Sequence, residues 1–134
     1  MTTGALGIVE AWQLAVNRAS ATDAVALMAE QVEVLGPRGE GLMPRHELGA
    51  WMVRSGFTAT PLRWFCDGNG TVVVEQDARW VDRETGQERG RAVVASRFTV
   101  DDEVVSRVVR HDKGLQAALA SAGLGSAHEV LYRA

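Results

Sequence analysis

The chain has 134 residues, of which 46% are hydrophobic and 23% are charged, so its composition is that of one globular domain with a core of its own. Its 17 acidic and 14 basic residues give a formal net charge of −3, which argues against a nucleic-acid partner because such partners require a basic patch. Cys66 is the only cysteine, which excludes an intrachain disulfide and a cysteine-based zinc cluster. No apolar run is long enough to span a membrane and residues 1–10 do not resemble a signal peptide, so we expect a cytoplasmic protein with no membrane partner.

Helical spacing dominates the first part of the chain. Apolar residues recur at steps of three and four over residues 5–19, which predicts one amphipathic helix, and a capping box opens a shorter helix over 20–28. QVEVLGP at 31–37 predicts a short strand, and RGEGL at 38–42 a glycine-rich loop. A third helix begins near Pro44 and ends before the glycine that follows RS.

The later part of the chain alternates apolar and polar residues, which is typical of strands. We expect strands near 62–67, 71–82, 89–100 and 103–111, separated by DGNG, RETG and DD, which carry turn chemistry. LQAALASA predicts a closing helix over 115–122. Helices followed by an antiparallel meander indicate a single α+β domain over 1–134, with helices on one face of the sheet.

This order of elements resembles the nuclear transport factor 2-like superfamily, which includes the SnoaL-like proteins and the ketosteroid isomerases. The resemblance rests on VEAWQLAVNRASATDAVALMAEQVEVLGPRG, on VVASRFTVDDEVVSRVVRHD and on LQAALASAGL as the closing helix. It implies a cystatin-like α+β roll, in which a curved antiparallel sheet is wrapped into a cone around the N-terminal helices. It also implies a cavity in the cone. The family hosts several reaction types and non-catalytic binding modules, so it predicts the fold more strongly than the function.

The residues that act in ketosteroid isomerases are replaced in this chain. In that family a tyrosine of the first helix and a carboxylic acid of a late strand stabilise an enolate, while an aspartate moves the proton. Laid on this pattern, Trp12 stands in the place of the tyrosine, Gly36 in that of the aspartate and Ser96 in that of the strand acid. An indole can donate a hydrogen bond but is no acid, and glycine cannot take a proton. We therefore expect no ketosteroid isomerase activity.

The faces of the strands decide which side chains line the cavity. A two-residue turn at 101–102 pairs Ser96 with Arg107, and the resemblance places Ser96 inside. Because strand side chains alternate, Arg107 and His111 then face the cavity as well, whereas a one-residue slip would reverse these assignments. The predicted catalytic candidates are His111 and Arg107, and the predicted ligand-binding residues are Trp12, Trp51, Gln76, Trp80, Ser96 and Phe98.

Three interpretations of function remain open. The first is a binding module whose cone holds a small, partly apolar ligand, with an anionic group favoured by the inward arginine. The second is a cyclase-, lyase- or hydrolase-type enzyme in which His111 is the general acid-base and Arg107 stabilises an oxyanion. The third is a dimeric scaffold with a filled cone. The plainer interpretation of the polar pair itself is that Arg107 is satisfied by an acidic neighbour or by water in the cavity, and that His111 lies at the open rim. No histidine spacing supports a metal site, and no cofactor is expected.

The outer face of the sheet predicts a partner. The apolar residues expected there are Val93, Ala95, Val104 and Val108. They lie among the charged residues Glu75, Asp77, Arg79, Arg97 and Arg110. Apolar residues interleaved with charges, together with the family's habit of packing sheet on sheet, favour a homodimer with a polar-rimmed interface.

Overall fold

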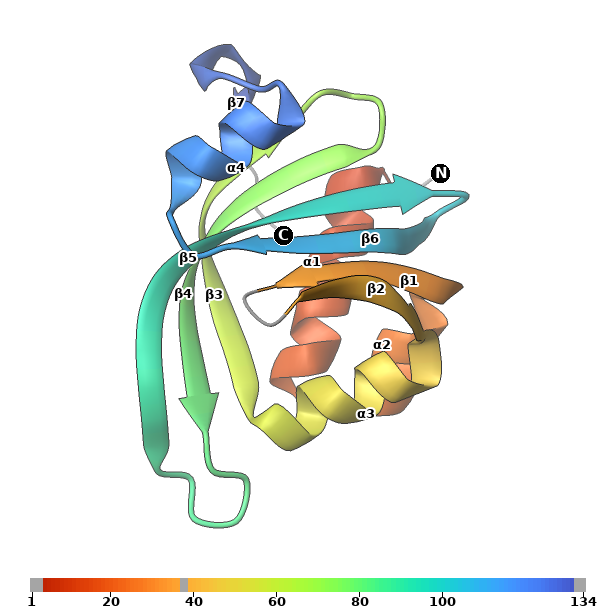
Figure 1. The fold of residues 1–134 in the computed structure, drawn as a ribbon, viewed down its shortest axis with the longest axis vertical. Helices are drawn as coiled ribbons and strands as arrows, with labels where there is room; N and C mark the ends of the chain where they lie inside the picture. Colours follow the sequence, from red (N-terminus) through yellow and green to blue (C-terminus); the bar gives the residue numbers. More distant parts are fainter. Residues whose placement is uncertain (1–3, 37–38, 132–134) are drawn as a thin grey trace.

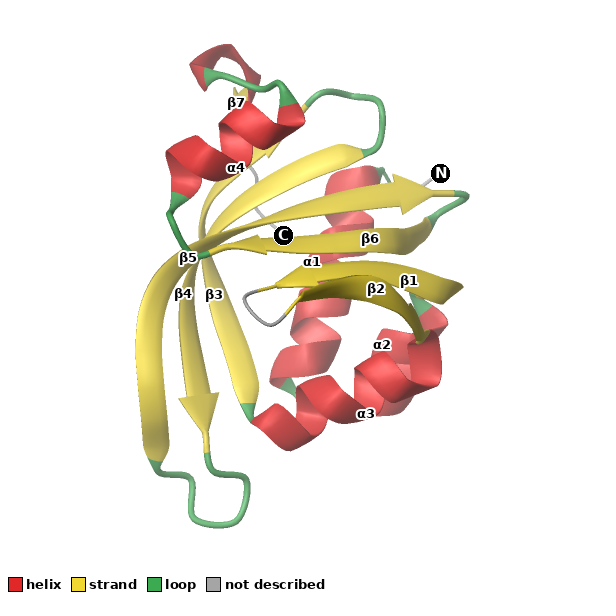
Figure 2. Cartoon of the chain, in the orientation of Figure 1, coloured by secondary structure: helices red, strands yellow, loops and turns green. Residues whose placement is uncertain are grey.

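The computed structural model describes residues 4–36 and 39–131, and it shows the N-terminal helices enclosed by a strongly curved sheet (Figures 1 and 2). The helices are α1 (Ala5–Asn17), α2 (Ala21–Ala26), α3 (Arg45–Ser55) and α4 (Leu115–Ala122), with a 3-10 turn, η1 (Ser126–His128). The strands are β1 (Met28–Gly36), β2 (Gly39–Pro44), β3 (Phe57–Cys66), β4 (Thr71–Val81), β5 (Glu88–Asp101), β6 (Val104–His111) and β7 (Glu129–Val130).

The described strands form one sheet in the order β2-β1-β6-β5-β4-β3-β7. The predicted α+β class and the cystatin-like roll are confirmed, and the sheet is antiparallel except that β1 and β6 run parallel. This parallel pair closes the cone, because it joins the N-terminal hairpin to the end of the meander.

The segment Gly39–Pro44 forms strand β2, so the prediction of a glycine-rich loop over 38–42 is wrong for its described residues. Its glycines indicate loop structure, but the segment turns back on β1 and pairs with it from Gln31↔Pro44 to Gly36↔Gly39. Backbone hydrogen bonding to a neighbouring strand overrides the low strand propensity of glycine. Strand β3 also begins earlier than expected, at Phe57, because Gly56 ends α3 in a left-handed conformation (φ 73°) and the chain enters the sheet at once.

The β5–β6 hairpin contains a bulge that determines the faces of β6. Its turn lies at Asp102 and Glu103, both with positive φ, so it is displaced from the predicted position 101–102. Val100 pairs with Val105 but Thr99 pairs with Arg107, which leaves Ser106 as an extra residue. The Ser106 hydroxyl donates to Asp101 Oδ2 (2.7 Å) and holds this bulge.

The displaced turn and the bulge have different consequences. Moving the turn by one position shifts the pairing by two residues, which leaves the faces unchanged, whereas the single extra residue of the bulge reverses them. Phe98 therefore lies opposite Val108, and Ser96 lies opposite Arg110. Beyond the bulge, the side chains of β6 that face α1 and α3 are those that the sequence placed outside.

The two faces of the sheet carry separate cores. The larger one joins α1, α2 and α3 to the concave face, with Trp12, Val32, Val74 and Phe98 almost fully buried. The smaller one joins α4 to the convex face, over Phe65, Val73 and Ala95. Helix α4 therefore lies on the side of the sheet opposite α1, as Figure 1 also shows.

Candidate functional site

A pocket of about 90 Å³ lies between the concave face of the sheet and helices α1 and α3. It is smaller than the roughly 300–1,000 Å³ of pockets that hold drug-sized ligands. Five aromatic side chains contribute to its wall: Trp12, Trp51, Phe57, Trp80 and Phe98. Trp12 meets Phe98 edge-on at 5.5 Å, and Phe57 meets Trp80 at 5.6 Å, so the aromatic wall is held by its own ring contacts. The pocket suits one small, largely apolar molecule.

The predicted ligand-binding residues come together in this pocket. Each of the six lies in its wall: Trp12, Trp51, Gln76, Trp80, Ser96 and Phe98. Their placement is thus as expected, while their role in binding stays a prediction. Trp51 is 45% exposed and lies at the rim, whereas Trp12 is 1% exposed and lies deep in the wall.

A strip of polar side chains crosses the otherwise apolar wall. The Ser96 hydroxyl donates to Gln76 Oε1 (2.7 Å), and Gln76 Nε2 donates to Gln13 Oε1 (2.9 Å). All three residues are at least nine-tenths buried. The indole N–H of Trp12 is also buried and has no hydrogen-bond partner in the described part of the chain. A buried donor without a partner is uncommon.

Arg110 is the arginine of the pocket wall. Its guanidinium lies over the Trp80 ring, 5.4 Å from the centroid, and its Nε donates to Asp112 Oδ1 (2.9 Å). The Arg110 side chain is 28% exposed and that of Asp112 49%, so this ion pair is only partly shielded from water. Asp112 offsets part of the positive charge that Arg110 brings to the pocket.

The prediction that Arg107 and His111 face the pocket is wrong. The bulge at Ser106 turns both to the convex face, where Arg107 Nε lies 3.7 Å from a Glu33 carboxylate oxygen. His111 Nε2 lies 3.2 Å from the hydroxyl of Ser121 on α4. Burial and the nearby Arg97 lower the pKa of His111, although Asp112 opposes this. Neither residue reaches the pocket, so the acid-base chemistry proposed for this pair lacks its groups there.

Sequence reasoning missed nine residues of the described wall, of which Gln13, Val108 and Arg110 matter most for its chemistry and its strand faces. Gln13 on α1 is 5% exposed, which the helical pattern did not indicate, because a glutamine on the buried side of a helix interrupts that pattern. The sequence analysis places Val108 and Arg110 on the outer face because it does not anticipate the bulge at Ser106, and the same bulge misplaces Arg107. No pattern in the sequence marks Ser106 as a bulged residue, so the inward faces of Val108 and Arg110 could not have been found from the sequence.

The described residues contain one group in the pocket wall that carries charge, Arg110, and none that titrates near neutral pH. Among residues 4–36 and 39–131, no three His, Cys, Asp or Glu side chains gather closely enough to hold a metal ion. Within the same residues, no helix is long and apolar enough to cross a membrane. His46 lies exposed on α3, and Trp64 is buried in the core but does not line the pocket.

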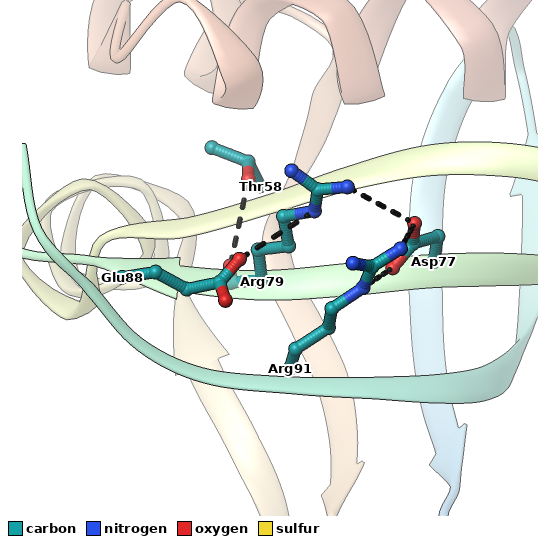
Figure 3. Close-up of polar contacts among 5 residues, drawn as sticks. All are labelled: Thr58, Asp77, Arg79, Glu88 and Arg91. Carbon is teal, nitrogen blue, oxygen red and sulfur yellow. Dashed lines mark hydrogen bonds and ion pairs between the residues drawn. The ribbon is translucent and has the colours of Figure 1, made fainter.

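The convex face differs from the prediction in two of its apolar residues. Val108 faces the pocket, and Ala95 is fully buried beneath α4. Val93 remains 59% exposed. Beside it, a charged cluster pairs within the chain: Asp77 accepts hydrogen bonds from Arg91 (2.8 and 3.1 Å) and Arg79 (3.4 Å), as Figure 3 shows. The hydrogen bond from Arg91, opposed by burial, lowers the pKa of Asp77.

Comparison with known proteins identifies the fold. The sequence matches no protein-family model, and no curated protein sequence is similar to it. Among solved structures, an NTF2-like protein of unknown function from Cytophaga hutchinsonii superposes with a TM-score of 0.70 and 14% identity, over 83% of this chain and 91% of that one. A candidate polyketide cyclase from Xanthomonas campestris pv. campestris gives 0.66 and 22%, over 79% and 87%.

A third structure was solved with a small molecule. It is a hypothetical protein with a ketosteroid isomerase-like fold from Catenulispora acidiphila, in complex with trimethylamine, with a TM-score of 0.64 and 18% identity over 88% of this chain and 93% of that one. Identities this low establish a shared fold and leave the activity of this chain to its own residues.

Proposed function

Because the chain has the nuclear transport factor 2-like fold, we propose that it binds a small, partly apolar molecule in its concave pocket and performs no acid-base chemistry on it. One observation carries this proposal: the described pocket wall is aromatic and amide-lined, with no carboxylate, histidine, cysteine or tyrosine. General acid-base catalysis needs a group whose pKa lies near the working pH, and an arginine does not supply one. The open volume also argues against a fully filled cone.

The ligand need not be anionic. The expectation of an anion depended on an unpaired arginine in the wall, and the arginine that lies there is partly offset by Asp112. A carboxylate can still approach Arg110 at Trp80, while a neutral ring fits the aromatic part of the pocket.

Ligand-observed NMR with toluene, cyclohexanone and benzoate at millimolar concentration tests the binding proposal. Val108→Phe places a ring in the pocket and should abolish binding of these probes. Val104→Phe, the same change on the same strand outside the pocket wall, should leave it intact. If none of the three probes binds the native protein, or if both variants bind equally well, the pocket is not the binding site.

We propose in addition that two copies associate through the part of the convex face that α4 leaves uncovered. Val93 supports this, because a valine that is 59% exposed lies there beside a cluster whose charges are already paired. Light scattering at micromolar concentration should give the mass of a dimer, and Val93→Glu should give the mass of a monomer. A native protein that is monomeric under these conditions contradicts this assembly.

A further inference from the structure

A chain of side-chain hydrogen bonds runs from the pocket to the backbone of an outer strand. Ser96 donates to Gln76, Gln76 donates to Gln13, and Gln13 Nε2 donates to Asn17 Oδ1 (3.0 Å). Asn17, at the end of α1, closes the chain on Ala59 of β3: its Nδ2 donates to the carbonyl oxygen (2.8 Å), and its Oδ1 accepts from the backbone N–H (2.9 Å).

The Ala59 backbone fixes the direction of every bond in this chain. A backbone N–H can only donate and a carbonyl can only accept, so the Asn17 amide has one permitted orientation. Gln13 must then present its NH₂ group to Asn17 Oδ1, which turns Gln13 Oε1 towards Gln76. Gln76 must in turn present its NH₂ group to Gln13, which turns Gln76 Oε1 towards Ser96. The Ser96 hydroxyl is left as the donor at 2.7 Å.

The consequence lies at the pocket wall. A serine hydroxyl normally donates or accepts as its partner requires, because its hydrogen rotates. Here the hydrogen is committed to Gln76, so Ser96 Oγ offers only lone pairs to the pocket. We infer that the ligand places a hydrogen-bond donor against Ser96, as a neutral alcohol, phenol or amide does, and that Ser96 discriminates against a carbonyl at this point. The inference rests on the proposed binding function and specifies the ligand class of that pocket.

The test compares two probes of equal ring size that differ in this one property. Cyclohexanol carries an O–H donor, and cyclohexanone carries only an acceptor. In the native protein we expect cyclohexanol to bind about fivefold to tenfold more tightly, the value of one net hydrogen bond. Dissociation constants come from isothermal titration calorimetry or ligand-observed NMR.

Two variants release the Ser96 hydrogen by different routes. Asn17→Ala acts outside the pocket wall: it frees Gln13 and Gln76 to turn over, so that Ser96 can donate to a ligand. Gln76→Met removes the acceptor of the Ser96 hydrogen directly. Both should bring the two probes to within about twofold of each other, because a free hydroxyl serves either partner. Asn69→Ala, an exposed asparagine in the β3–β4 turn, is the matched control and should keep the native preference.

The outcomes are distinct. Equal binding of both probes to the native protein overturns the inference and leaves the binding function standing. The same holds if a variant with a native near-ultraviolet circular dichroism spectrum keeps the full preference for cyclohexanol. If neither cyclohexanol nor cyclohexanone binds the native protein, the proposed function is overturned, and the inference falls with it. Asn17 does not line the pocket. If Asn17→Ala loses the preference for cyclohexanol over cyclohexanone, the preference therefore depends on the direction of the hydrogen bonds and not only on contact with Ser96.

Discussion

Gly56 joins α3 to β3, between two residues of the pocket wall, and replacing it with alanine should destabilise the fold severely. Its φ of 73° is left-handed, which costs a non-glycine residue about 1–2 kcal/mol. The new Cβ would also overlap the backbone carbonyl of Val81. Val81 cannot move away freely, because its own N–H donates to the carbonyl oxygen of Gly56 (2.9 Å). Crowding of this kind adds about 1–3 kcal/mol, so the expected total is about 2–5 kcal/mol.

Gly123, at the end of α4, provides the matched control. Its φ is 70°, but a Cβ there would have no atom within 4 Å. Gly123→Ala should therefore cost only the conformational penalty of about 1–2 kcal/mol. Urea unfolding followed by fluorescence of the 4 tryptophans measures both free energies. If the two variants lose the same stability to within about 0.5 kcal/mol, the contact with Val81 does not restrain the entry to β3, and the steric argument fails.

Three further predictions concern pH, binding and activity. The pKa of His111 and that of Asp82, which accepts backbone hydrogen bonds from Glu84 and Thr85, are both lowered on folding, so the unfolded chain binds protons first. The contribution of both groups to the free energy of unfolding should thus be fully present above about pH 7.5. The contribution of His111 should be lost as the pH falls from 6.5, its ordinary value, through its lower value in the folded protein, and that of Asp82 as the pH falls from 3.8 in the same way. Urea titrations across pH measure this, and stability that rises on acidification contradicts it. Arg110→Met should weaken benzoate binding by about threefold to tenfold and leave toluene binding unchanged. Arg107→Met should change the binding of neither probe. If Arg107→Met weakens benzoate binding more than Arg110→Met does, Arg107 and not Arg110 faces the pocket. A steroid enone assay should show no double-bond migration above background, and clear turnover would mean that a proton-transferring group has been overlooked.

The long strands of the meander could be predicted from sequence together with their faces. In β4 and β5, the resemblance places Ser96 and Gln76 on the inner face. The uninterrupted pairing of the two strands from Thr71↔Thr99 to Trp80↔Gly90 keeps that assignment correct along their length. Strand β6 could not be predicted in this way, since one bulged residue reverses its parity and DDE admits more than one two-residue turn. The Gly-rich strand β2 was missed because its pairing partner, and not its composition, makes it a strand.

The parallel pairing of β1 with β6 has a consequence for how the chain folds. The β5–β6 hairpin is local and can form within microseconds, in its bulged register or in a regular one that would turn His111 inwards. Strand β1 contacts only the bulged arrangement, through Val34↔Val108 and Leu35↔Val109. That contact joins segments far apart in the sequence and forms late, because its loop-closure entropy is large. A strand that docks after the hairpin has closed therefore selects its register, and a hairpin that closes without its bulge must reopen before the sheet can be completed.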